Sequence, residues 1–278
     1  LNAGTISNKG VELGLDVTPI VSTESFSWDM RLNWSKNVNE VVSLAEGIQN
    51  LPVADDNTPP FGPQIVAREG EELGTFWGTG FATNDEGERI VTPGAFATYQ
   101  STGNQVLGSY RPDWTGSAST TLSYNNLSLR VLVDGQKGGK VWSLSNLFGL
   151  YSGMFQQTVR NNQRRLGVVP EGANTAEISP RSMYQGLFGL HEAHLYDASY
   201  IKLREASISY RLPQSWLSDL PLSQFNVSVT GRNLATLLKY TPNFDPTAVT
   251  RDAGNLQGIE AGQMPPKRTF GIRLRASF

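Results

Sequence analysis

The chain has 278 residues, of which 17% are charged and 38% hydrophobic, and its 23 lysines and arginines nearly balance its 25 aspartates and glutamates. This near-neutral balance gives no reason to expect a nucleic-acid partner. No apolar run approaches the roughly 18 residues of a membrane-spanning helix. The chain has no cysteine, which excludes a disulfide framework, a thiolate zinc site and a cysteine nucleophile.

The strongest pattern is strict alternation of apolar and polar residues, which is typical of β-strands. It covers residues 11–18, 26–35, 127–134, 225–230 and 270–278, and a weaker form covers residues 114–124. Residues 200–212 alternate too, but the phase changes near Arg204 and Glu205, which predicts a β-bulge. The result is about seven strands of roughly 9–12 residues, the length of a tilted strand that crosses a bilayer.

The connections between these segments alternate between short and long. Residues 18–24 and 124–126 are short turns and residues 213–223 a moderate one, whereas residues 38–113, 136–198 and 233–266 are long connections. Short turns on one side and long loops on the other are typical of outer-membrane barrels. The sequence therefore predicts an all-β fold: an antiparallel transmembrane β-barrel segment with long extracellular loops.

Alternation alone fits two environments. In a soluble β-sandwich the apolar face packs inward, whereas in a membrane barrel it faces lipid and the polar face lines the lumen. The strand length, the aromatic residues at strand ends and the paired charges on the polar face favour the barrel. We expect lipid to contact Val11, Leu13, Leu15, Val17, Ile272 and Leu274. We expect the lumen to be lined by Glu12, Asp16, Asp29, Arg31, Arg273 and Arg275.

Five stretches of the chain, in order, carry a resemblance to a known family. They are residues 2–12 (NAGTISNKGVE), 70–78 (GEELGTFWG), 197–204 (DASYIKLR), 230–234 (TGRNL) with 239–240 (KY) and 245–246 (DP), and 265–271 (PPKRTFG) before the last strand. In these stretches the chain resembles the C-terminal barrel portion of SusC/RagA-type TonB-dependent outer-membrane transporters. The terminal Phe278 adds to the resemblance, which implies that this aromatic residue is an assembly signal.

The resemblance implies a barrel of about 22 strands with a plug in its lumen, located in the outer membrane of a Gram-negative-type bacterium. It further implies active import of an oligosaccharide or peptide through the TonB complex, and a SusD-like lipoprotein as an extracellular lid. We expect residues 1–278 to be the C-terminal part of such a barrel, surrounded by lipid, with the plug and the TonB-contacting segment absent from this chain. Two alternatives stay open: a passive or structural barrel without TonB coupling, and a soluble secreted β-sandwich that binds carbohydrate.

No catalytic motif is recognisable, so we expect no enzyme, and nothing calls for a cofactor. His191 and His194 have the spacing of a metal pair but no third ligand nearby, so loop histidines are the favoured interpretation. Residues 84–88 (NDEGE) favour a turn over a calcium loop. Aromatic residues outside the long strands can contact substrate or lid protein, or else pack the loops onto one another. The candidates for contact are Phe76, Trp77, Tyr99, Trp142, Tyr151 and Tyr184.

Overall fold

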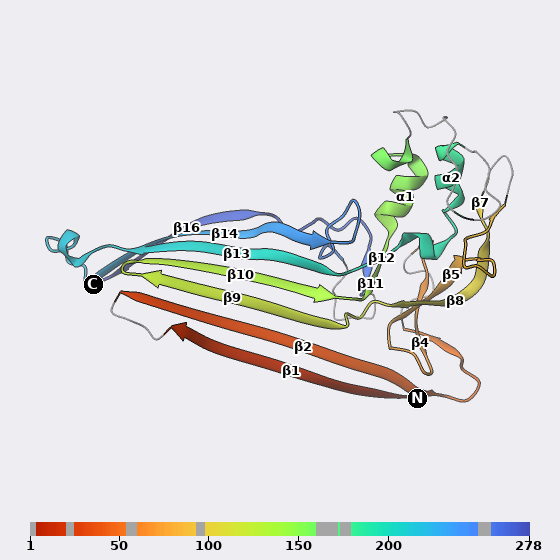
Figure 1. Cartoon of the computed structure of the whole chain (residues 1–278), viewed down its shortest axis with the longest axis horizontal. Coiled ribbons are helices and arrows are strands. Elements are labelled where there is room, and N and C mark those ends of the chain that lie inside the picture. Colours follow the sequence, from red (N-terminus) through yellow and green to blue (C-terminus); the bar gives the residue numbers. More distant parts are fainter. Residues whose placement is uncertain are drawn as a thin grey trace.

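Seven long strands form one continuous antiparallel sheet in the computed structural model, which describes residues 4–20, 25–53, 60–92, 98–159, 172, 179–249 and 257–278 (Figure 1). In sheet order they are β1 (Gly4–Ile20), β2 (Phe26–Leu44), β9 (Trp114–Tyr124), β10 (Leu127–Lys137), β13 (Tyr200–Arg211), β14 (Gln224–Lys239) and β16 (Thr269–Ser277). Sheet order follows chain order throughout, as in an up-and-down barrel wall. The predicted all-β fold with seven long strands is confirmed.

The register gives the sheet two different faces. Leu15 pairs with Leu32, and its neighbour Asp16 pairs with Arg31 on the opposite face. The same segregation continues across the sheet, where Val229 pairs with Ile272 and Ser228 with Arg273. One face of the described sheet is therefore apolar and the other polar.

The predicted β-bulge is present in β13. Leu132 pairs with Glu205 and Val133 with Leu203, so Arg204 is left out of the ladder. A second shift lies between Leu203 and Glu205 where β13 pairs with β14. The extra residue changes the phase of β13 and keeps apolar residues on one face on both sides of the bulge.

Several strands extend beyond the predicted segments, β2 and β14 among them. The long connections were expected to begin at Val38 and Asn233, but β2 continues to Leu44 and β14 to Lys239. The alternation of apolar residues ends before the strand does, because it marks only the part of the strand that carries the apolar face. Backbone pairing, such as Lys9 with Val38, continues past that face.

The three long connections fold into a loop region with its own secondary structure. It contains a sheet of β3 (Asn50–Pro52), β4 (Gln64–Arg68), β5 (Thr75–Phe81) and β8 (Ser101–Ser109), a pair β6 (Val91–Thr92) and β7 (Thr98–Tyr99), and a sheet of β11 (Lys140–Ser143), β12 (Leu195–Asp197) and β15 (Ile259–Glu260). Helices α1 (Leu144–Ser152) and α2 (Pro180–Gly186) and short 3-10 helices η1 (Gln156–Thr158) and η2 (His191–His194) complete it, while η3 (Gln214–Trp216) lies in the turn before β14.

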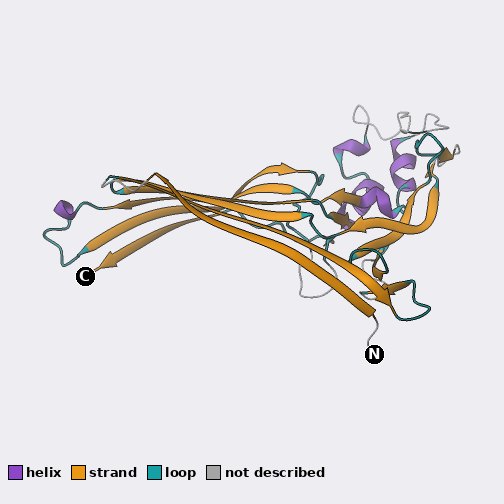
Figure 2. Cartoon of the chain, turned by 60° about the horizontal axis from the view of Figure 1, so that its bottom comes forward, coloured by secondary structure: helices purple, strands orange, loops and turns teal. Residues whose placement is uncertain are grey.

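The loop region gathers at one end of the sheet and the C-terminus lies at the other (Figures 1 and 2). Its core contains residues from all three connections: Ile65 and Phe76 from the first, Trp142 and Leu147 from the second, and Ile259 from the third. This shared core makes the three loops one packed unit. None of the helices in the described part of the chain combines the length and the apolarity needed to cross a membrane.

Candidate functional site

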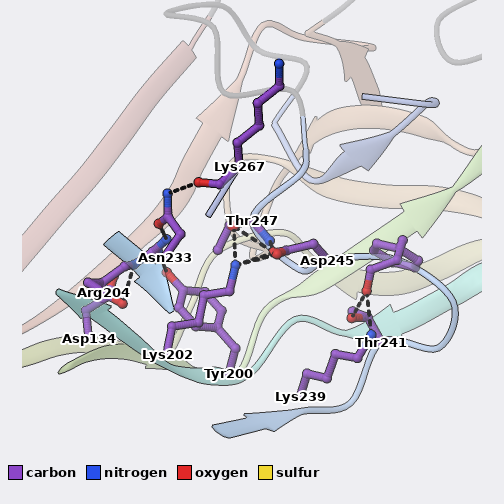
Figure 3. Close-up of polar contacts among 11 residues, drawn as sticks. Asp134, Tyr200, Lys202, Arg204, Asn233, Lys239, Thr241, Asp245, Thr247 and Lys267 are labelled. Atoms are coloured by element: carbon purple, nitrogen blue, oxygen red, sulfur yellow. Dashed lines mark hydrogen bonds and ion pairs between the residues drawn. The ribbon is translucent and has the colours of Figure 1, made fainter. Parts of the chain in front are cut away.

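The loop region is attached to the polar face of the sheet by a buried ion pair. The Lys202 ammonium on β13 lies 2.5 Å from the Asp245 carboxylate and 2.7 Å from the Thr247 hydroxyl, both in the third long connection (Figure 3). The side chain of Lys202 is only 6% exposed and that of Asp245 19%. Burial alone would raise the pKa of Asp245, but hydrogen bonds from Lys202 and Thr247 hold it below its ordinary value. The ion pair fixes the loop on this face.

A second charge pair involves Arg204, the residue that the β-bulge leaves out of the ladder. The Arg204 Nε donates to the Asp134 carboxylate on β10, and the Arg204 guanidinium also reaches the Tyr200 hydroxyl and the Asn233 side chain (Figure 3). Arg204 follows Lys202 by two residues, so both side chains lie on the polar face, and the bulge leaves Arg204 out of the backbone ladder. Charged residues from β10 and β13 thus form one network with the third long connection.

The motifs that carry the family resemblance converge on this network. Asn233 adopts a positive φ of 51° and its amide donates to the Lys267 carbonyl, while Lys239 donates to the Phe244 carbonyl (Figure 3). Segments 197–204, 230–246 and 265–271 therefore meet in space. The sequence motifs mark where the loops join the wall, a role that spacing along the chain did not reveal.

The motif at residues 70–78 makes the corresponding attachment for the first connection. The Leu73 N–H donates to the Asn39 side chain on β2, and the Leu73 carbonyl accepts from Arg111. Gly74 has a φ of 97°, and a Cβ there would collide with the Tyr110 ring. Only glycine therefore fits at this position.

His191 and His194 serve the packing of the loop region. The Thr79 N–H donates to His191 Nδ1, and buried His194 Nε2 donates to the Leu187 carbonyl. Burial lowers the pKa of His194 to about 4. Among the described residues, no group of three or more histidine, aspartate or glutamate side chains could hold a metal ion. Residues 84–88 form a turn in which the Asn84 side chain accepts from the Glu88 N–H.

Acidification is expected to loosen the loop region through His194. Its ordinary pKa is 6.5 and its folded value about 4, so the unfolded loops bind a proton that the folded loops exclude. Stability is therefore nearly complete above about pH 6.5 and falls toward pH 4, with a loss of about 2–3 kcal/mol near pH 4.5. Native-state proteolysis of the loops measures this, and His194→Gln should remove most of the pH dependence. If loop stability fell with pH as steeply in that variant as in the wild type, His194 would not be the cause of the pH dependence.

The six aromatic candidates divide by burial. Phe76 and Trp142 are fully buried in the shared loop core, and Tyr99 is buried against Phe81 at a ring distance of 5.1 Å. These three pack the loops onto one another. Trp77 and Tyr184 are partly exposed and Tyr151 is 41% exposed, so their contact with substrate or lid protein stays a prediction.

The six charged residues expected in the lumen share the polar face of the sheet. The Asp16 carboxylate pairs with Arg31 at 2.6 Å, and Arg273 and Arg275 pair in register with Ser228 and Asn226. Glu12 and Asp29 pair with Ser35 and Thr121 on that same face. The six form a polar surface, and its assignment to the lumen stays a prediction.

A cavity of about 320 Å³ lies between the loop region and the wall. The sequence did not predict that its lining residues meet there. Its walls include Tyr110, Arg111, Gln136, Lys140 and Tyr200. They come from segments far apart in the sequence, and no motif spacing signals their meeting. The cavity offers aromatic faces, cations and an amide, which suit a polar ligand.

Comparison with known proteins places this geometry in context. No protein-family model matches the chain. The chain is 28% identical over its whole length to TonB-dependent receptor P3 of Formosa agariphila, of which it covers 29%. Two solved structures resemble it at 21% identity: the RagAB peptide transporter, with a TM-score of 0.68, and the RagAB peptide importer in the closed-closed state, with a TM-score of 0.69. Each match covers the whole of this chain and 30% of the solved chain.

The chain thus spans less than a third of the length of these relatives. The matches extend over the long strands and the loop region alike, because they include the whole chain. The resemblance to TonB-dependent receptors of the SusC/RagA type is thereby confirmed, and the fold is that of part of such a receptor's β-barrel.

Proposed function

We propose that residues 1–278 form the C-terminal part of the barrel wall and of the extracellular vestibule in an outer-membrane TonB-dependent importer. The observation that carries this proposal is the uncovered apolar face. Leu13 is 60% and Ile272 75% exposed, and in the described part of the chain no second sheet packs on them. A soluble sandwich would bury this face, whereas lipid is the environment that favours its exposure.

The rest of the importer lies outside this chain in our proposal. The remaining strands complete the barrel, because an open sheet edge in lipid leaves backbone groups unpaired. A plug fills the lumen, a TonB-contacting segment couples transport to TonB, and a SusD-like lipoprotein covers the loops. The two RagAB structures are of a peptide transporter, and we propose a peptide or an oligosaccharide as the nutrient here.

The loop region contributes the vestibule. Trp77, Tyr151 and Tyr184 retain exposed ring surface that can stack on a sugar face or pack on a peptide side chain. The polar face with Asp16 and Arg31 then lines the path below. Packing through Trp142 and the Lys202–Asp245 pair keeps the vestibule in one shape.

Uptake by cells that express the whole receptor tests the proposal. We expect labelled oligosaccharides or peptides to enter only when TonB is present and the membrane is energised. Uptake that continues without TonB would favour the passive barrel. A receptor recovered in the soluble fraction without detergent would favour the secreted sandwich and overturn the proposal.

Phe278 is expected to act in assembly and not in transport. By alternation its ring lies on the apolar face, and it is 90% exposed at the end of the sheet opposite the loops. There it can anchor at the membrane interface. Replacing Phe278 with aspartate should reduce the amount of receptor in the outer membrane several-fold, while uptake per inserted molecule changes little.

Surface labelling and uptake, measured on the same cells, separate the two effects. Ser277→Asp serves as a matched control, because it places the same charge on the neighbouring residue of the polar face. Normal insertion with lost uptake in the Phe278 variant would move this residue from assembly to the transport path.

A further inference from the structure

Three lysines lie on the apolar side of the sheet, just beyond the end of its apolar band. On β2 the outward residues run Phe26, Trp28, Met30, Leu32 and Trp34, and the next outward residue is Lys36. Lys9 lies outward on β1, opposite Val38. Lys137, at the end of β10, pairs with Trp114 on β9.

In the register of the sheet, Lys36 and Lys137 flank one aromatic residue, and Lys9 follows on the next strand. Ser35 pairs with Thr115, so the next position along brings Lys36 beside Trp114. Trp114 thus lies between Lys36 and Lys137 on neighbouring strands. Lys9 is the diagonal neighbour of Lys36, because Val11 pairs with Lys36. We call Lys9, Lys36, Lys137 and Trp114 the lysine belt.

All four members of the belt are exposed. The Lys137 ammonium lies 5.8 Å from the centre of the Tyr240 ring, which orients this side chain along the outer surface. Glu40, farther along β2, is the acidic side chain on the same face of that strand, opposite Ser7. The charge of Lys137 also acts on the Asp197 carboxylate. Three lysines against the two acidic groups Glu40 and Asp197 leave the belt with a net positive charge.

The belt occupies the height at which lipid headgroups would lie. The segment from Phe26 to Trp34 has a length within the roughly 9–11 residues with which a tilted strand crosses the apolar part of a bilayer. Lys36 is the first outward residue after this segment. The loop end of the apolar band is the extracellular side in the proposed orientation, so the belt lies at the outer-leaflet headgroups.

We propose that the lysine belt binds the phosphate groups of lipid headgroups in the outer leaflet. This inference rests on the proposed function, since it needs the apolar face to contact lipid. Ammonium groups pair with phosphates as point charges, and an indole ring is favoured at the headgroup level. Together they would favour phosphorylated anionic lipid over zwitterionic lipid next to β1, β2, β9 and β10.

Quenching of tryptophan fluorescence by brominated lipids tests this preference. The whole receptor is reconstituted in bilayers that contain brominated phosphatidylglycerol or brominated phosphatidylcholine. Subtracting the signal of a Trp114→Phe variant isolates Trp114. Since each lysine contributes about fivefold at an anionic surface, K9Q/K36Q/K137Q should reduce the preference for phosphatidylglycerol at Trp114 at least tenfold. Raised salt should weaken the wild-type preference in the same direction.

A control variant removes the same number of positive charges elsewhere. R181Q/R211Q/K267Q changes one residue of α2, the last residue of β13 and one residue of the segment before β16, and should keep the wild-type preference. An unchanged preference in the belt variant, or an equal loss in the control variant, would overturn the belt. Failure of brominated phosphatidylcholine to quench any tryptophan would instead show that the apolar face does not contact lipid, and the proposed function would fail with it.

Discussion

Replacing Lys202 with methionine is expected to detach the third long connection from the barrel wall. The substitution leaves the Asp245 carboxylate largely buried without its ammonium partner, and only Thr247 still donates to it. Removing one member of a buried ion pair costs about 3–5 kcal/mol. Because the loops share one core through Trp142 and Ile259, the opening should spread to the second connection as well.

Native-state proteolysis of the whole receptor measures this free energy of opening. Arg232→Gln provides the control, since the Arg232 side chain in its pair with Glu205 is 61% exposed, and an ion pair with an exposed member is worth about 1 kcal/mol or less. The double variant K202M/D245L removes both charges and should regain much of the lost stability. Loops that open no more easily in K202M than in R232Q would contradict the role of this pair.

The long strands could be predicted from the sequence because their pattern is local. Each strand has one face in a single environment, so apolar residues recur at every second position over its length, as in β16. The bulge at Arg204 was predictable for the same reason, since one extra residue changes the phase of the alternation. Strand ends were less predictable, because pairing beyond the apolar band leaves no such pattern in residues 38–44.

The loop region could not be predicted to the same depth, because its contacts are long-range. Lys202 and Asp245 are 43 residues apart, and Ser143 and Glu260, which join β11 to β15, are 117 residues apart. Loop aromatics also carry no periodic signal that separates buried from exposed rings. Phe76 and Trp77 are adjacent, yet the first is fully buried and the second partly exposed. Only the packing of three connections on one another decides between them.

The assignment of the sheet's two faces leads to a large expected effect at neighbouring residues of β2. Leu32 lies on the apolar face, opposite Leu15 and Ala118, and Asn33 lies on the polar face, opposite Gly14 and Ser117. In the proposed barrel, Leu32→Arg places a guanidinium in lipid at a cost of about 2–4 kcal/mol near the bilayer midplane. Asn33→Arg places it among polar side chains in the aqueous lumen, where it should cost little.

Heat-induced or urea-induced unfolding in lipid vesicles gives the two free energies directly, and surface labelling of cells gives the inserted amount. We expect Leu32→Arg to lose stability by about 2–4 kcal/mol and to insert poorly, while Asn33→Arg inserts nearly as the wild type does. The two variants carry the same new charge one residue apart, so propensity and net charge cannot explain a difference between them. Equal losses would mean that both faces meet the same environment, and the reverse order would place the lumen on the apolar side.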